Sequence, residues 1–221
     1  MKKNIPKHIG YIVDGNRRWA KAKGLKTVEG HKAGFEALKD VVKFTHEKGV
    51  DFVSAYIFST ENWNRTAEEV GYLMKLFETY FDKEIKQLHK DNIKVLFSGN
   101  RTQKVSKKIV QLMNEAEELT AKNTGGTLCL CFNYGGQLEI VEAVKKIANK
   151  VAEGLISPED IDSRLIFDNL YHPEVPALDL MVRTSGEQRI SNFQLWRVAY
   201  SELLFLDKAW PDMDESDVDY I

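Results

Sequence analysis

The stretch of sequence that decides the fold is His8-Ile9-Gly10-Tyr11-Ile12-Val13-Asp14-Gly15-Asn16-Arg17-Arg18-Trp19. A largely apolar run of strand length ends at Asp14 and Gly15, and helix-favouring residues follow the turn at positions 20–23. A buried strand that turns directly into a helix is typical of α/β proteins. In such proteins ligands bind beyond the carboxyl ends of the strands, so the turn at Asp14 is the first place to look for chemistry.

The same alternation of strand and helix continues along the chain. Short apolar runs predict strands at residues 8–13, 51–58, 93–97, 127–132, 178–182 and 202–206. Helical periodicity predicts helices at residues 34–48, 67–90, 102–122, 137–151 and 191–199. Continuous apolar strands separated by helices favour a parallel sheet covered on both faces. We therefore expect a single α/β domain over residues 1–221, with a central, mainly parallel six-stranded sheet flanked by helices.

Composition excludes several classes of protein. The chain has 221 residues, 43% of them hydrophobic, which is typical of globular domains. With 31 basic and 33 acidic residues, the net charge of −2 provides no overall field for holding nucleic acid. The apolar runs are far shorter than a membrane span of about 20 residues.

The two cysteines, Cys129 and Cys131, are too close to bridge comfortably within a strand. Buried thiols and the lack of a cleavage site after the basic N-terminus favour the cytoplasm.

The turn after the first predicted strand has the features of an anion site. Arg17 and Arg18 lie in the first turn of a predicted helix, where the helix dipole disfavours cations unless an anion is bound there. Asp14 is then positioned to hold a divalent cation against a phosphate. A plain β-turn with surface arginines explains the same residues, and the segment lacks the known phosphate-loop motifs.

Two further strand ends carry clusters of polar residues. Ser59-Thr60-Glu61-Asn62-Trp63-Asn64-Arg65 follows the second strand. A capping box formed by Thr66 and Glu69 accounts for the start of the next helix but leaves Ser59, Asn62 and Trp63 unexplained. After the fifth strand, Arg183 and Arg189 bracket a loop that leads to Ser191 at a predicted helix start. This arrangement favours a second oxyanion site over ordinary surface arginines.

The predicted helix from Ala67 has an unusually wide apolar face. The face consists of Val70, Leu73, Leu76, Phe77, Tyr80, Phe81, Ile85 and Leu88. A helix that packs on the core explains this pattern, and so does one wall of a cavity for a long apolar ligand. Two phosphate sites beside such a cavity suggest two diphosphates and a hydrocarbon.

Six motifs occur in order along nearly the whole chain: residues 8–20 with Asp14-Gly15-Asn16-x-Arg18-Trp19-Ala20, Gly30-His31-x-x-Gly34, Phe58-Ser59-Thr60-Glu61-Asn62-Trp63, Asn133-Tyr134-Gly135-Gly136, Arg183-Thr184-x-Gly186-Glu187-x-Arg189-Ile190-Ser191-Asn192-Phe193 and Trp210-Pro211-Asp212. They resemble the motifs of the cis-prenyltransferases, the undecaprenyl diphosphate synthase family. The resemblance implies condensation of isopentenyl diphosphate onto an allylic diphosphate, with farnesyl diphosphate as the expected allylic substrate. The product would be a cis-polyprenyl diphosphate such as undecaprenyl diphosphate, the lipid-carrier precursor of cell-wall synthesis. It also implies Mg²⁺ as cofactor, a homodimer, and a transient membrane contact for product release.

The resemblance also assigns roles to individual residues. Asp14 would bind Mg²⁺, and Glu202 would match the acidic residue near the metal and the dimer contact. Asp14, Ser59 and Asn62 form the expected catalytic set, and any of them, or a released phosphate, could accept the proton. The expected substrate-binding residues are Gly15, Asn16, Arg17, Arg18, Trp19, His31, Ser59, Thr60, Glu61, Trp63, Arg65, Arg183, Arg189 and Ser191.

Some positions depart from the family pattern. Thr27 stands where relatives commonly carry an arginine, and Gln137 and Gln188 replace a usual Arg and a frequent His. In the expected prenyl cavity, Ile57 would narrow the wall and Gly126 would deepen the floor. The alternatives that remain are a shorter-chain synthase, a non-catalytic accessory subunit of the same fold, and a nucleotide-binding phosphotransferase.

Overall fold

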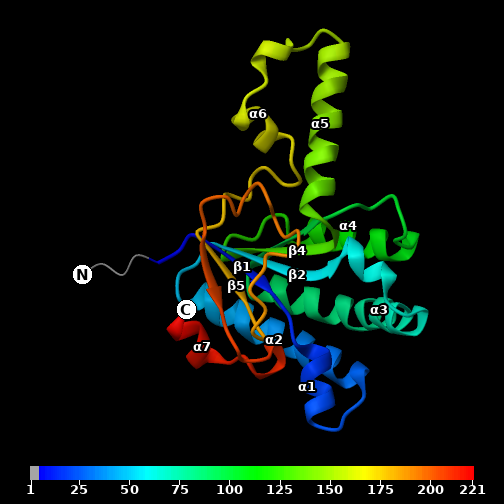
Figure 1. The fold of residues 1–221 in the computed structure, drawn as a ribbon, viewed down its shortest axis with the longest axis vertical. Coiled ribbons are helices and arrows are strands. Elements are labelled where there is room, and N and C mark those ends of the chain that lie inside the picture. The colour runs from blue at the N-terminus through cyan, green and yellow to red at the C-terminus, as the bar shows by residue number, and fades with distance from the viewer. Residues whose placement is uncertain (1–4) are drawn as a thin grey trace.

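The protein is built on one six-stranded parallel sheet (Figure 1). The computed structural model describes residues 5–221, except for the side chains of Tyr80 and Asp82, so the expectation for Tyr80 lies outside the described part. The strand order is β3-β4-β2-β1-β5-β6. The strands are β1 (His8–Ile12), β2 (Phe52–Ser59), β3 (Ile93–Ser98), β4 (Gly126–Tyr134), β5 (Leu180–Arg183) and β6 (Glu202–Phe205). All six predicted strands and the predicted fold class are confirmed.

Helices connect the strands and differ in places from the sequence expectation. They are α1 (Asn16–Ala22), α2 (Thr27–Glu47), α3 (Ala67–Lys90), α4 (Lys107–Thr120), α5 (Gly136–Ala152), α6 (Ser163–Asp168) and α7 (Glu215–Tyr220), with short 3₁₀ turns η1 (Thr60–Asn64), η2 (Pro158–Asp160) and η3 (Trp210–Asp212). Helix α2 begins seven residues before the predicted start, and α4 begins later, after Ser106 caps it.

The helix predicted at residues 191–199 is wrong. The segment forms turns, with Ser191, Asn192 and Gln194 at positive φ. Its apolar pattern arises because Phe193 and Val198 pack into the cluster that includes Tyr56 and Leu178, while the buried Arg197 pairs with Glu139 at the start of α5. The buried residues of this turn-rich segment thus have a spacing in sequence that resembles helical periodicity.

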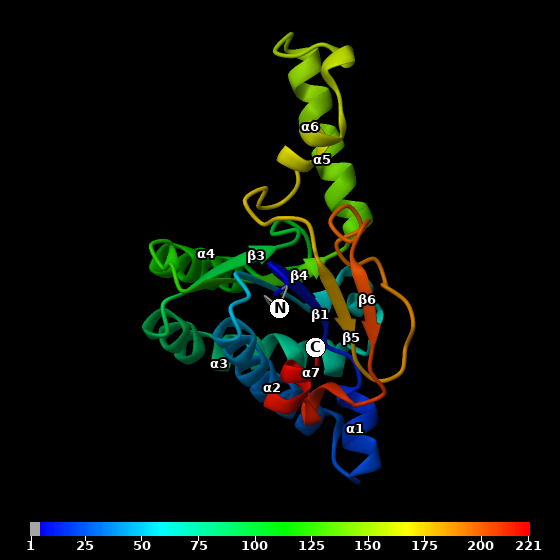
Figure 2. The ribbon, with the colours of Figure 1, turned by 90° about the vertical axis from the view of Figure 1, so that its left-hand side faces the viewer.

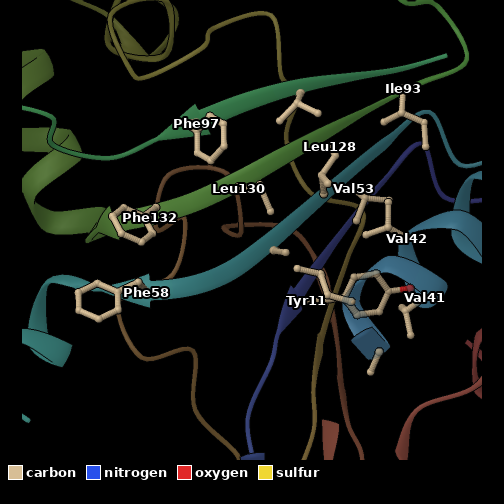
Figure 3. Close-up of a cluster of buried hydrophobic side chains, with 14 of the residues drawn as sticks. Tyr11, Val41, Val42, Val53, Phe58, Ile93, Phe97, Leu128, Leu130 and Phe132 are labelled. Carbon is tan, nitrogen blue, oxygen red and sulfur yellow. The ribbon is translucent and has the colours of Figure 1, made fainter. Parts of the chain in front are cut away.

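The two faces of the sheet have different coverings. On one face α2, α3 and α4 enclose the main core, and Figure 3 shows its side chains on β2, β4 and α2. Phe58 and Phe132 stack at the carboxyl ends of β2 and β4, with ring centroids 5.3 Å apart. The opposite face packs against the segment that includes Leu178 and Phe193, and both free cysteines are buried there or close by, without a disulfide.

Helices α5 and α6 extend away from the sheet as an arm (Figures 1 and 2). Only the inner side of α5 is buried, at Gly136, Glu139, Ala143 and Ile147. Its outer side exposes Val141 and Val144, each close to half of its surface. The arm therefore presents apolar side chains that the described chain does not cover.

Strand register brings three of the predicted site segments to one edge. Ile12, the last residue of β1, pairs with Tyr56 of β2 and with Arg183 of β5. Strands β2 and β5 lie on opposite sides of β1, and α/β sheets open a crevice at such a change in strand order. Glu202 begins β6 beside Leu180, at the other end of the strands. Within one chain, Glu202 and Asp14 are therefore not neighbours.

Candidate active site

Asp14 is held in a network of positive groups. Arg183 donates from Nη2 to Asp14 Oδ2 at 2.9 Å, and Arg18 Nη2 lies 3.3 Å from the same oxygen. The Gly15 N–H donates to Oδ1 at 2.7 Å. Partial burial alone would raise the pKa of Asp14, but these partners outweigh it and hold the pKa below its usual value. Asp14 is thus a carboxylate at neutral pH.

Thr184 fixes the backbone of the same turn. Its hydroxyl donates to the Asp14 carbonyl at 2.7 Å and lies 3.1 Å from the Asp14 N–H. Gly15 is the N-cap of α1, with φ 106, and the helix begins at Asn16. Added to Gly15, a Cβ would lie 2.8 Å from Ser185 Oγ. The turn therefore requires glycine both for its conformation and for its close approach to the β5 loop.

Arg183 is the most buried of the positive groups, with 5% of its surface exposed. Its Nη1 donates to the Arg189 carbonyl at 2.6 Å and to Ser191 Oγ at 2.7 Å. Its Nε is buried and has no hydrogen-bond partner among the described residues. A buried guanidinium donor without an acceptor indicates a position for an anion.

Glu187 links the two predicted phosphate sites. It accepts from Arg18 Nη1 at 2.8 Å and from Arg189 through its other oxygen. The side chain of Arg189 is 59% exposed. Arg189 is linked to the site through the Glu187 carboxylate and through its own backbone carbonyl, which accepts from Arg183. Carboxylates thus hold arginines of both loops, as a bound diphosphate would.

Glu69 gathers a second set of donors. It accepts from His31 Nε2 at 3.2 Å and from Arg65 Nη1 at 3.0 Å, and Arg17 lies 3.5 Å from its other oxygen. Burial lowers the pKa of His31, although Glu69 opposes the shift, so His31 is neutral at neutral pH. Thr66 caps α3 as predicted, but the Glu69 side chain turns to these partners instead of completing a capping box.

The polar segment after β2 forms a rigid turn. Asn62 accepts from the Ser59 N–H at 3.1 Å, and the Ser59 side chain accepts from the backbone of η1 in return. Trp63 donates to Asn133 at 2.7 Å and packs edge-on against Phe58. Capping therefore explains more of this segment than the sequence alone indicated, although Ser59 and Asn62 still face the cavity beside Asp14.

An apolar cavity opens beside these polar groups. It measures about 130 Å³ and lies between α2, α3 and the sheet. Asn16 and His31 border it and also line the polar pocket around Asp14, so the two spaces meet there. The carboxamide oxygen of Asn16 is buried and has no partner among the described residues. The wide face of α3 lines this cavity, through Leu73, Leu76, Phe77, Phe81, Ile85 and Leu88.

The two residues expected to shape the cavity have different outcomes. Ile57 lines it, as expected. Gly126 does not, and the expectation that it deepens the floor is wrong, because the His46 ring lies over it. A Cβ on Gly126 would lie 2.5 Å from His46 Nδ1. The glycine makes room for histidine, not for ligand.

Comparison with known proteins identifies the family. Residues 12–221 match the family model described as "Putative undecaprenyl diphosphate synthase". The chain belongs to this family. It is 45% identical to "Isoprenyl transferase 2" of Bradyrhizobium diazoefficiens, covering 97% of this chain and 85% of that protein. It is 46% identical to the "Ditrans,polycis-undecaprenyl-diphosphate synthase ((2E,6E)-farnesyl-diphosphate specific)" of Aliivibrio fischeri, covering 96% and 82%.

A solved structure of the family supports the same fold. The crystal structure of lavandulyl diphosphate synthase from Lavandula x intermedia, in complex with dimethylallyl diphosphate, superimposes with a TM-score of 0.93 at 33% identity. The match covers 98% of this chain and 93% of that one. The sheet order and helical layers described above are therefore those of this prenyltransferase family.

The structure brings most, but not all, of the predicted site residues together. Those that line the described pockets are Asp14, Gly15, Asn16, Arg17, Arg18, His31, Ser59, Glu61, Asn62, Arg65, Arg183 and Ser191. Trp19 instead donates to Asp212 at 2.6 Å, the Thr60 hydroxyl donates to Glu61 at 3.1 Å, and Trp63 packs edge-on against Phe58. Sequence reasoning missed Glu69, Glu187 and Thr184 as site residues. Thr184 and Glu187 lie inside the motif that starts at Arg183, which was the available signal, whereas Glu69 lies outside the six motifs and was interpreted only as part of a helix cap.

The donor set is compatible with Mg²⁺ only if substrate contributes ligands. No cluster of three or more His, Cys, Asp or Glu side chains suited to a metal occurs in residues 5–221 as described. Mg²⁺ is commonly held by one or two carboxylates together with phosphates and water. The ionised Asp14 beside Arg18 and Arg183 fits such a site. Glu202 lies at the opposite end of the sheet, so one chain does not bring it to the same ion.

Proposed function

We propose that this member of the family is a Mg²⁺-dependent cis-prenyltransferase that condenses isopentenyl diphosphate with an allylic diphosphate, farnesyl diphosphate. The product is a polyprenyl diphosphate such as undecaprenyl diphosphate. The observation that carries the proposal is the junction at Asn16 and His31, where an arginine-rich pocket opens into an apolar cavity. That arrangement matches a substrate with a diphosphate head and a prenyl tail. The names of relatives such as the Aliivibrio fischeri enzyme support the same substrates.

The two diphosphates occupy neighbouring sets of donors in this proposal. The allylic diphosphate lies against Gly15, Asn16 and Arg18, with its tail directed past His31 into the cavity. Isopentenyl diphosphate lies against Arg183 and Ser191, with Arg189 reaching it when released from Glu187. Each anion replaces contacts that these arginines make to the carboxylates of Asp14 and Glu187.

The reaction requires charge stabilisation and positioning more than covalent chemistry. Arg18 and backbone N–H groups neutralise the negative charge that develops on the leaving diphosphate. The wall formed by Ile57 and Phe58 holds the allylic carbon chain beside the second substrate. Asp14, Ser59 or Asn62 accepts the proton lost from isopentenyl diphosphate. In an alternative route, a released phosphate accepts this proton instead. Asp14 would hold Mg²⁺, which would supply further neutralisation of the charge on the leaving group.

The activity assay uses radiolabelled isopentenyl diphosphate, farnesyl diphosphate and Mg²⁺, followed by separation of products by chain length. The expected result is a series of labelled polyprenyl diphosphates that disappears when EDTA removes Mg²⁺. No labelled product above farnesyl length would contradict the proposal. Activity that persists in EDTA would contradict the metal requirement alone.

A shorter-chain product is the second candidate. The observation that favours it is the cavity of about 130 Å³, with Ile57 in its wall. A long prenyl tail requires this space to widen. The same assay separates the two candidates, because products that end within a few additions support the shorter-chain enzyme.

A homodimer in the cytoplasm completes the proposal. Tyr200 is fully exposed, and Leu203 and the arm residues Val141 and Val144 are each close to half exposed. These side chains form more apolar surface than a monomer usually leaves uncovered. In residues 5–221, no helix is long and apolar enough to cross a membrane. Light scattering at micromolar concentration should give about twice the 25.3 kDa chain mass, and a value near 25 kDa would refute the dimer.

A further inference from the structure

An ion pair interrupts the apolar cavity. Lys39 of α2 and Glu84 of α3 both line it, and Lys39 Nζ lies 3.2 Å from Glu84 Oε2. The other polar side chains along the described wall are Asn16 and His31, where the cavity meets the diphosphate pocket. A charged pair in the wall of a space for hydrocarbon is not explained by diphosphate binding.

The pair lies well inside the cavity. Lys39 follows His31 by eight residues along α2, which is about 12 Å at the helical rise of 1.5 Å per residue. Glu84 follows Leu73 by eleven residues along α3, or about 16 Å. Val42 and Leu88 line the cavity about 5 Å further on. Apolar wall therefore continues beyond the pair.

Lys39 is held as an ammonium, and its outer partner Glu36 is exposed to solvent. Glu84 is only 7% exposed, whereas Glu36, the second partner of Lys39 at 2.7 Å, keeps 46% of its side chain exposed. Burial opposes a rise in the pKa of Lys39, but Glu36 and Glu84 together hold that pKa above its usual value. A hydrocarbon that passes this level removes water from ionised groups, which is unfavourable.

We propose that the Lys39–Glu84 ion pair is a determinant of product length, because it opposes the passage of prenyl chains into the deeper part of the cavity. The inference rests on the proposed prenyltransferase function and refines it. Chains that end before the pair bind in an apolar wall. Chains that pass it bind against charges, so the pair shifts the products toward shorter lengths.

A purely structural role is the alternative, because the pair also joins α2 to α3. Three variants separate charge from structure. Lys39→Met with Glu84→Leu removes both charges, whereas Lys39→Glu with Glu84→Lys exchanges them and retains the link. Lys43→Met is the matched control, because Lys43 lies on the same helix, 60% exposed, and does not line the cavity. Circular dichroism and thermal melting establish that each variant is folded.

The first measurement needs no catalysis. Calorimetry gives the affinity of n-alkyl monophosphates of increasing length, each below its critical micelle concentration. In the parent we expect affinity to rise about fourfold per CH₂ and then to flatten at the length that reaches the pair. In the neutral variant the rise continues for at least three further carbons, and in the exchanged and Lys43→Met variants it stops where it does in the parent. A break at the same length in parent and neutral variant would overturn the proposal.

The second measurement is the product distribution from labelled isopentenyl diphosphate. The neutral variant should shift products by at least one isoprene unit toward longer chains, while the exchanged variant and Lys43→Met keep the parental lengths. Parental lengths in the neutral variant, or longer products in the exchanged variant, would overturn the role of charge. A parent that makes no product refutes the proposed function, and the alkyl phosphate series still decides the role of the pair.

Discussion

Replacement of Arg183 by lysine tests whether this site depends on guanidinium geometry or only on positive charge. The guanidinium contacts three different groups at once: Asp14 Oδ2 at 2.9 Å, the Arg189 carbonyl at 2.6 Å and Ser191 Oγ at 2.7 Å. Its Nε is buried and has no hydrogen-bond partner among the described residues. A lysine keeps the charge, but its single ammonium cannot reproduce the planar fork.

The expected loss follows from these contacts. Hydrogen bonds to charged groups contribute about 1.5–3 kcal/mol each. An ammonium that stays near Asp14 gives up the contacts to Arg189 and Ser191, or at least about 3 kcal/mol of positioning for the substrate. At about 1.4 kcal/mol per factor of ten, kcat/KM for isopentenyl diphosphate should fall by about two orders of magnitude.

The assay is steady-state kinetics with each substrate varied in turn, at saturating Mg²⁺. We expect the loss to appear mainly as a higher KM for isopentenyl diphosphate, with a smaller change for farnesyl diphosphate. Arg189→Lys is the matched control, because the Arg189 side chain is 59% exposed, and its loss should be under about tenfold. Urea unfolding of both variants separates a loss of binding from a loss of fold.

Two results would refute this reasoning. Arg183→Lys with kcat/KM within about threefold of the parent would mean that charge alone suffices. An equal rise in KM for both substrates would contradict two distinct diphosphate sites. Either result can be read only from variants that retain the parental unfolding midpoint.

Further changes test other parts of the molecule. Asp14→Ala should lower turnover by at least about a thousandfold while the fold is kept, because several kcal/mol of metal and charge stabilisation are lost; activity within about tenfold of the parent at saturating Mg²⁺ contradicts this. Ile57→Ala should lengthen the products, and an unchanged distribution would exclude Ile57 as a limit on chain length. Gly126→Leu should lower the melting temperature without shortening the products of the remaining folded enzyme, because the new side chain meets His46. Burial lowers the pKa of His8 from 6.5 to about 4, so the folded protein resists protonation of this ring. The free energy of unfolding, measured in urea, should therefore fall by about 3 kcal/mol as the pH is lowered from 6.5 to 4. A His8→Gln variant should lack this part of the pH dependence.

Local sequence patterns determined the layers of the fold. Strands β1 to β5 were recognisable because a parallel sheet covered on both faces requires short continuous apolar runs, whereas the edge strand β6 gave a weaker signal and is partly exposed. Helix α3 was recognisable to the residue, from Ala67 to Lys90, because its cap and its apolar period are both local signals. For residues 191–199 the same reasoning predicted a helix wrongly, because the spacing of their apolar residues reflects contacts with the face of the sheet.

For the site, the sequence alone determined which residue types gather at the strand ends, and the resemblance to the family assigned them roles. Only the tertiary structure decided how they are connected. It showed that Glu69 and Glu187 hold arginines far away in sequence, that Gly126 makes room for His46, and that Glu202 lies at the opposite end of the sheet from Asp14. The physical reason is that strand order and register set these distances, and they depend on packing of the whole chain, which no local pattern encodes.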